Sequence, residues 1–300
     1  MKKKLLFKGT GTALITPFTH DGSIDEKRLR QLVDFQIANG VEALLPTGTT
    51  GESVTLSEEE QERVIEIVVG QANSRVPVIA GAGSNSTKKA IALSHRMLAA
   101  GADGILSVGP YYNKPTQEGY FQHYEAIAEA TGAPIIIYNV PGRTASNIEA
   151  ETTLRMAEEI TMIAGIKEAS ANFGQIMEIL RHRPKHFGLW SGDDAITLPL
   201  IALGADGIVS VVSNEVPKLF SDMVRLCFKG EFSRALKIHN MLLPLMNFNF
   251  VESNPIPVKA VLAAMGLIEE EYRLPMVPLS DKYRSRMRKI LSDLKKNKGR

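Results

Sequence analysis

A single lysine stands near the end of a short apolar stretch, Met162–Ser170, where a buried strand would normally carry only apolar side chains. Burying the Lys167 ammonium group costs free energy unless its charge is compensated, and desolvation lowers the pKa of an amine. The neutral amine is then a nucleophile near pH 7, as Schiff-base chemistry with a carbonyl substrate requires. The stretch by itself favours the simpler alternative, a lysine whose side chain reaches solvent at a strand end.

Hydroxyl, phenol and guanidinium groups follow the other apolar stretches of the chain. They stand in Pro46–Ser53, Gly109–Asn113, Tyr138–Thr144, Ser191–Asp194 and at Ser210. A phenol can move protons to and from a carbinolamine and an enamine, small hydroxyls and glycine N–H groups can hold a carboxylate, and an arginine can clamp a second carboxylate. The set therefore suits an amine-dependent reaction of a keto acid.

Two other interpretations of the same residues remain open. The Gly48-Thr-Thr-Gly51 turn could cradle a phosphate, although it lacks the lysine and the spacing of a P-loop. Each tyrosine could be a core residue whose hydroxyl is merely satisfied. We expect no metal site, because the six histidines are scattered along the chain.

The elements that would position these residues alternate between strand-like and helix-like segments. The predicted strands are Gly11–Phe18, Ala43–Leu45, Val76–Ala82, Gly104–Val108, Pro134–Val140, Met162–Ala169, Phe187–Ser191 and Gly207–Val212. The predicted helices are Asp25–Asn39, Ser57–Gln71, Ser86–Ala100, Thr116–Thr131, Glu149–Ile160, Phe173–His182, Asp194–Leu203 and Val216–Phe228. Ser57 with Glu60 forms a capping-box start.

Strands that are joined by helices must be parallel, and eight such units favour an α/β fold, a (β/α)8 TIM barrel. A weak repeat supports the count, since Gly40, Gly101 and Gly204 each precede an apolar strand and are placed to end a helix in the left-handed conformation. The alternative is an open doubly wound sheet, but Gly9-Thr-Gly11 lacks the third glycine of a dinucleotide turn.

In residues 231–300 the alternation of strands and helices stops, and the sequence predicts helices only, at Phe232–Phe250, Pro257–Met265 and Ser280–Leu294. We therefore divide the chain into a catalytic barrel at 1–230 and a C-terminal helical appendage at 231–300. In the barrel, the polar residues named above would meet at the carboxyl ends of the strands.

Composition and charge exclude several classes of protein. Hydrophobic content of 44% and charged content of 23% are ordinary for a globular protein, and a net charge of +2 gives no field for nucleic acid. Residues 281–300 carry nine Lys/Arg against two Asp, which we interpret as a solvated helix face or a frayed terminus rather than a nucleic-acid patch. The lone Cys227 fits a reducing cytoplasm, and no signal peptide follows Lys2–Lys4 and no apolar run has membrane-spanning length.

Five motifs occur in order over nearly the whole chain: Gly48-Thr-Thr-Gly-Glu-Ser53, Tyr111-Tyr-Asn-Lys-Pro115, Tyr138-Asn-Val-Pro-Gly-Arg-Thr144, Gly165-Ile-Lys-Glu-Ala169 and Ser191-Gly-Asp-Asp194. Together they resemble the dihydrodipicolinate synthase family, which belongs with N-acetylneuraminate lyase to the pyruvate-dependent class I aldolases. The resemblance implies condensation of pyruvate with L-aspartate 4-semialdehyde to 4-hydroxy-tetrahydrodipicolinate, in lysine and diaminopimelate biosynthesis. It also implies a homotetramer, a dimer of dimers, and no cofactor beyond the imine that pyruvate forms on the lysine.

The resemblance assigns roles residue by residue. Lys167 matches the Schiff-base lysine, Tyr138 the central proton-relay tyrosine, and Thr49 the hydroxyl linked to it. Tyr112 matches the relay tyrosine that a neighbouring subunit contributes. The substrate-binding positions are Thr50 for the pyruvate carboxylate, Arg143 for the carboxylate of the semialdehyde, and Gly192 and Val209 around the pocket.

Two alternatives stay open against this assignment. A related lyase could act on a sugar acid such as N-acetylneuraminate or 2-keto-3-deoxygluconate, but such polyols call for neutral groups where this chain has the cation Arg143. A barrel without catalysis could bind a keto acid or a partner, but that hypothesis predicts the loss of Lys167, Tyr138 or Thr49, and all three are present.

The chain departs from the family at its possible allosteric site. Ser53, Asn85 and Tyr111 resemble the residues that line the lysine-inhibitor site of bacterial members. Where those members often carry His, His and Glu, this chain has Glu58, Gln61 and Lys89.

We therefore expect weak or absent inhibition by lysine. The Lys89 ammonium would repel the side-chain ammonium of the inhibitor, and Glu58 would offset only part of that repulsion. A like-charge pair near a surface costs about 1–4 kcal/mol, which is a tenfold loss of affinity or more. A lysine titration of the activity tests this, and half-inhibition well below a millimolar would contradict it.

Overall fold

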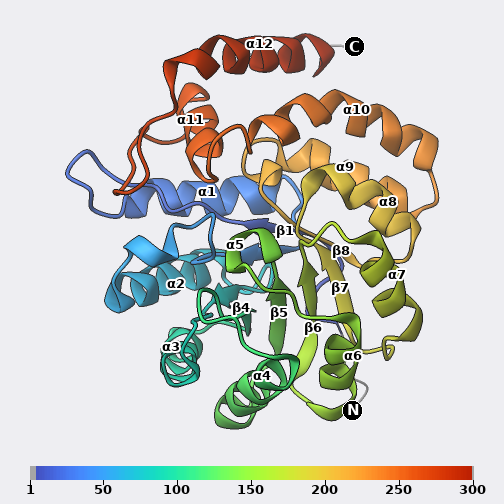
Figure 1. Cartoon of the computed structure of the whole chain (residues 1–300). Coiled ribbons are helices and arrows are strands. Elements are labelled where there is room, and N and C mark those ends of the chain that lie inside the picture. The colour runs from blue at the N-terminus through green and yellow to red at the C-terminus, as the bar shows by residue number, and fades with distance from the viewer. Residues whose placement is uncertain (1–4, 299–300) are drawn as a thin grey trace.

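Eight parallel strands form one sheet in the computed structural model, which describes residues 5–298. They are β1 (Gly9–Ala13), β2 (Ala43–Leu45), β3 (Ile79–Gly81), β4 (Gly104–Val108), β5 (Ile135–Asn139), β6 (Ile163–Glu168), β7 (Gly188–Ser191) and β8 (Gly207–Ser210). Their order is β2-β1-β8-β7-β6-β5-β4-β3. A parallel bridge between Leu44 and Val78 joins the two ends, so the predicted (β/α)8 barrel is confirmed (Figure 1).

Helices cover the outside of this barrel. Those of the barrel are α1 (Glu26–Ala38), α2 (Glu58–Ala72), α3 (Thr87–Ala99), α4 (Gln117–Thr131), α5 (Pro141–Thr144), α6 (Ala150–Glu159), α7 (Phe173–His182), α8 (Thr197–Ala202) and α9 (Pro217–Phe228). The predicted capping box is present, because the Glu60 N–H donates to Ser57 Oγ and the Ser57 N–H donates to the Glu60 carboxylate. The predicted glycines also end their helices with φ of +83°, +99° and +108° at Gly40, Gly101 and Gly204.

Three predicted boundaries of strands and helices were wrong. The first strand ends at Ala13, and Leu14–Phe18 stays buried but leaves the sheet, where Ile15 N–H donates to the side chain of Asn214. The strand predicted at Val76–Ala82 covers only Ile79–Gly81. The helix predicted from Asp194 begins as a 3₁₀ turn and becomes α8 only at Thr197.

The barrel interior is filled by one large ring. Trp190 on β7 is fully buried, and Phe7 stacks on it with ring centroids 4.8 Å apart. Glycines on the neighbouring strand positions leave room for the indole: a Cβ at Gly165 would lie 2.6 Å from it. These rings belong to the same interior core as Tyr138 and Val209.

The C-terminal part consists of α10 (Phe232–Phe248), α11 (Ile256–Ala264) and α12 (Asp281–Lys298), which lie together on one side of the barrel (Figure 1). Side chains of α10, α11 and α12 share an apolar core with β8, α8 and α9. The division at residues 230 and 231 stays a prediction.

On α12, Met287 and Leu294 are buried while Arg286 and Lys289 are exposed, as a solvated basic face requires. Lys2–Lys4 and the last two residues of the basic tail lie outside the described residues. None of the helices within residues 5–298 combines the length and apolarity of a membrane span.

Substituting Gly188 with alanine should destabilise the fold by about 1–3 kcal/mol, the cost of overfilling a packed core. Its Cβ would lie 2.3 Å from Cη2 of Trp190, a ring that Phe7 holds in place. The matched control is Gly70→Ala on the exposed side of α2, which meets nothing within 4 Å and should leave stability equal or higher. Urea unfolding of both variants measures the difference, and equal midpoints would contradict the packing argument.

Candidate active site

Three of the predicted site residues lie together at the barrel mouth. Lys167 on β6 and Tyr138 on β5 are paired across neighbouring strands, and Lys167 Nζ lies 3.9 Å from the centroid of the Tyr138 ring. The hydroxyl of Tyr138 is hydrogen bonded to the side chain of Thr49, from the loop after β2. Lys167 and Tyr138 are 6% and 7% exposed, so an amine, a phenol and an alcohol meet in one desolvated place.

The surroundings of the Lys167 amine lower its pKa to near neutral pH. Its pKa is lowered to about 7, mainly by burial and in smaller part by the positive charge of Arg143, while the carboxylate of Asp194 acts in the opposite direction. Burial also raises the pKa of Tyr138, against smaller lowering contributions from Arg143 and the Thr49 hydrogen bond. At neutral pH the site therefore offers a nucleophilic amine beside a protonated phenol.

The expected substrate-binding positions surround the same lysine. Gly192 follows β7 and leaves room for Lys167, because a Cβ at Gly192 would lie 3.2 Å from Lys167 Cε. Val209 is buried on β8 in the interior core that also contains Tyr138. Thr50 is 3% exposed, and its Oγ1 accepts a hydrogen bond from Asn254 Nδ2 at 2.9 Å.

A cavity of about 410 Å³ opens in front of the Tyr138–Thr49 pair. Arg143 lines it from α5, a single helical turn that begins at Pro141. The cavity continues to Ser53 and Tyr111, two of the possible allosteric residues, and on to Glu58, Gln61 and Lys89. Lys167, Thr50, Gly192 and Val209 do not line it directly, and Lys167 lies behind the Tyr138 ring.

Two predicted residues are not brought to this cavity by the single chain. Tyr112 is 89% exposed and has a backbone φ of +73°. Asn85 contacts the same loop instead, since its carbonyl oxygen accepts a hydrogen bond from Asn113 Nδ2 at 2.9 Å.

Sequence reasoning missed two contributions to the site. Asp194 is buried, accepts hydrogen bonds from Ser210 Oγ and the Val212 N–H, and has a pKa raised by burial to about 6; it was noted only as part of a polar strand end. Asn254 belongs to the C-terminal part, and the rule that active-site residues follow the barrel strands does not predict its contribution. Within residues 5–298 no group of three or more His, Cys, Asp or Glu side chains could hold a metal ion.

Fold and site together define the class of barrels that present a buried amine at the carboxyl ends of their strands. Within that class, residues 6–294 match the model of the dihydrodipicolinate synthetase family, and the chain belongs to this family.

The chain is similar to members of this family over nearly its full length and nearly the full length of each relative. It is 54% identical over 279 residues to the 4-hydroxy-tetrahydrodipicolinate synthase of Chloroherpeton thalassium, covering 93% of this chain and 92% of that one. It is 49% identical to the enzyme of the same name from Salinibacter ruber, covering 96% and 95%. The crystal structure of dihydrodipicolinate synthase from Thermotoga maritima superposes with a TM-score of 0.95 at 44% identity, covering 97% and 99%.

The pH dependence of imine formation should follow the Lys167 amine. Below its pKa of about 7 the ammonium form is unreactive, so reductive alkylation by acetaldehyde and cyanoborohydride should rise with pH and reach half its maximum near pH 7. Arg143→Met removes a charge that disfavours the ammonium form, and the midpoint should move to higher pH. Peptide mapping of the Lys167 adduct gives the rates.

The neutral aldehyde is chosen because it needs no cation for binding. Arg234→Met, on an exposed part of α10, is the control and should keep the original midpoint. An Arg143→Met midpoint that coincides with this control would contradict the electrostatic argument.

Proposed function

We propose that this chain condenses pyruvate with L-aspartate 4-semialdehyde through an imine on Lys167 and yields 4-hydroxy-tetrahydrodipicolinate. The observation that carries the proposal is the buried amine beside the Tyr138–Thr49 pair, with Arg143 on the adjoining cavity. The 4-hydroxy-tetrahydrodipicolinate synthases that match over nearly their whole length support the same activity. The sugar-acid lyases have no comparable support, because a fixed cation suits a carboxylate better than a polyol.

The reaction follows from the groups in place. The neutral Lys167 amine attacks the C2 carbonyl of pyruvate, and Tyr138 supplies the proton that lets the carbinolamine lose water. The deprotonated Tyr138 takes a methyl proton, which gives an enamine. The enamine carbon attacks the aldehyde of the second substrate, and Tyr138 returns the proton to the aldehyde oxygen, which becomes the 4-hydroxyl. The amino group of that substrate then attacks C2, closes the ring and releases Lys167, so that one water leaves overall. The imine itself is the electron sink, and the proposal includes no cofactor.

The binding groups divide between the two substrates. The Thr50 hydroxyl, in the loop that also carries Thr49, suits the carboxylate of pyruvate. Arg143 stands on α5 at the cavity, apart from that loop, and its planar fork suits the carboxylate of the semialdehyde. Gly192 and Val209 shape the space around Lys167.

The proposal includes a cytoplasmic homotetramer, a dimer of dimers, in which Tyr112 completes a neighbour's site. A tyrosine that is 89% exposed on a left-handed backbone is strained and unprotected in the single chain. A partner surface would cover the ring and account for the strain. One solved relative is described as a monomeric dihydrodipicolinate synthase variant, so the assembly varies within the family.

A coupled assay tests the proposal by offering pyruvate with aspartate semialdehyde against pyruvate with N-acetylmannosamine. We expect turnover with the semialdehyde only, and borohydride with pyruvate should add a stable mass to the Lys167 peptide. Arg143→Ala should lower kcat/KM for the semialdehyde by the equivalent of about 2–5 kcal/mol, because truncation leaves a carboxylate unpaired.

The internal control in the Arg143→Ala variant is the pyruvate adduct, measured at a pH above the raised midpoint of its amine, where it should form on Lys167 as in the parent. Turnover with N-acetylmannosamine would support the lyase instead. An adduct on another residue, or none, would show that the role given to Lys167 is wrong.

A further inference from the structure

The loop between β2 and α2 carries Thr49 and Thr50, and a buried ion pair holds it from outside the barrel. Glu52 in this loop is 3% exposed and has a φ of +55°, a conformation that residues other than glycine rarely adopt. Its Oε1 accepts a hydrogen bond from Lys259 Nζ on α11 at 2.6 Å. Because neither charge has access to water, each depends on the other, and the pair fixes the loop to α11.

The lysine of this pair is itself tightly placed. Lys259 is fully buried, and its Nζ lies 4.2 Å from the ring centroid of Phe18 and 5.1 Å from that of Tyr272. Both rings offer their faces to the ammonium group, which limits where the amine and its Glu52 partner can move. The ion pair is therefore an anchor of defined position and not a flexible surface contact.

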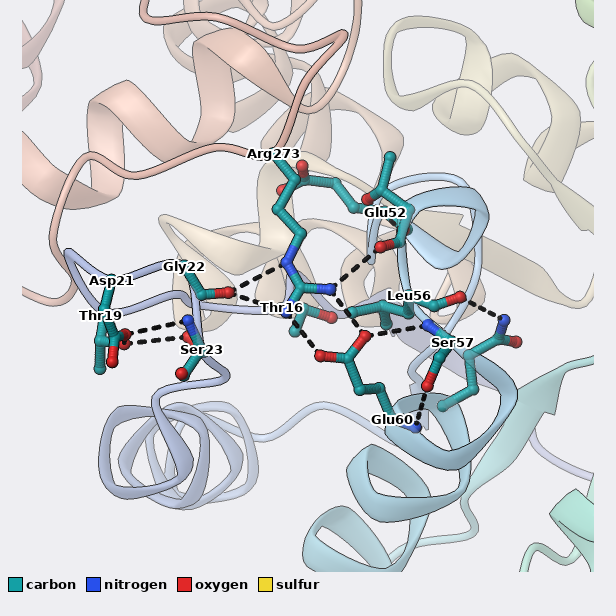
Figure 2. Close-up of polar contacts among 12 residues, drawn as sticks. Thr16, Thr19, Asp21, Gly22, Ser23, Glu52, Leu56, Ser57, Glu60 and Arg273 are labelled. Carbon is teal, nitrogen blue, oxygen red and sulfur yellow. Dashed lines mark hydrogen bonds and ion pairs between the residues drawn. The ribbon is translucent and has the colours of Figure 1, made fainter.

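Two more residues of the C-terminal part hold the same loop. Asn254 Nδ2 donates to Thr50 Oγ1 at 2.9 Å in a buried contact. Arg273 donates to the Thr55 carbonyl at 3.0 Å. It also donates to both oxygens of Glu60, at 2.6 and 2.7 Å (Figure 2). The loop is thus fixed at its middle and at the capping box where α2 begins.

Glu52 lies close to Thr49 in the sequence, so a displacement of the ion pair can reach the candidate active site. The Glu52 N–H donates to the Thr49 carbonyl at 3.2 Å, and the Thr49 side chain is hydrogen bonded to Tyr138. A displaced Glu52 would therefore move Thr49, and loss of the Asn254 contact would free the hydroxyl of Thr50.

We propose that Lys259 and Asn254 are positioning residues, through which the C-terminal helices set Thr49 and Thr50 for the keto acid. This inference rests on the proposed function. It predicts a larger effect on pyruvate than on the semialdehyde. The contacts described above hold the loop of Thr49 and Thr50 and none of them reaches α5, which carries Arg143, although Glu52 and Asn254 also line the cavity beside Arg143. If these contacts only stabilised the fold, their loss would change the KM values of both substrates alike or change neither.

The test replaces the charged pair by a neutral pair of similar size, Glu52→Gln with Lys259→Met. Neutralising both partners leaves no unpaired buried charge, so the variant should fold with a melting temperature close to that of the parent. The KM for pyruvate should rise about tenfold or more, since small misplacements of binding groups are costly, while the KM for aspartate semialdehyde stays within about twofold.

The matched control is Glu270→Gln with Arg284→Met. This pair also lies in the C-terminal part, with N–O distances of 2.9 Å, and is not among the contacts to the loop. Both of its KM values should equal those of the parent.

A second variant, Asn254→Ala, removes only the donor to Thr50 and introduces no charge. It should also raise the KM for pyruvate selectively, and it decides the question if circular dichroism shows that the Glu52/Lys259 variant has not folded. Unchanged KM values in the folded variants, or equal changes for both substrates, would overturn the positioning role. A parent enzyme that does not condense the two substrates would instead refute the proposed function.

Discussion

The desolvation of one amine is the constraint on which the rest of the structure depends. An ammonium group inside a closed barrel has lost its water, and for Lys167 this loss is the largest cause of its lowered pKa. The Leu44–Val78 bridge closes the sheet, and the fully buried Trp190 on β7 is paired with Lys167 across neighbouring strands. The barrel is thus part of the proposed chemistry, because β6 lies between β5 and β7 and its Lys167 is buried there.

The charges around the amine adjust this effect in opposite directions. Arg143 disfavours the ammonium form and Asp194 favours it, and Asp194 is itself held by Ser210 Oγ and the backbone N–H of Val212. These partners hold the Asp194 carboxylate, so it favours the ammonium form from a defined position. The result is an amine that can exist in both protonation states near neutral pH, which a reaction that both forms and breaks an imine requires.

Much of this could be predicted from local sequence, because helix caps and strand periodicity are local. Ser57 with Glu60, and glycine at Gly40, carry their structural meaning within a few residues. The convergence of Lys167, Tyr138 and Thr49 followed from one geometric rule about strand ends. The end of the first strand was wrong because Leu14–Phe18 is apolar for tertiary reasons. The Asn254–Thr50 and Lys259–Glu52 contacts span 204 and 207 residues, and no local sequence pattern predicts a contact between residues so far apart.

Lys167 and Lys259, which are both buried, show why residue type alone could not have identified the nucleophile. Burial lowers the pKa of both amines. Lys259 has Glu52 at 2.6 Å and two aromatic faces around it, so its charge is compensated and its nitrogen is occupied. Lys167 has the edge of a cavity beyond the Tyr138 ring and a cation, Arg143, that opposes its protonation. The same side chain therefore serves as a structural cation in one place and as a candidate nucleophile in the other, and the carboxylate in direct contact makes the difference.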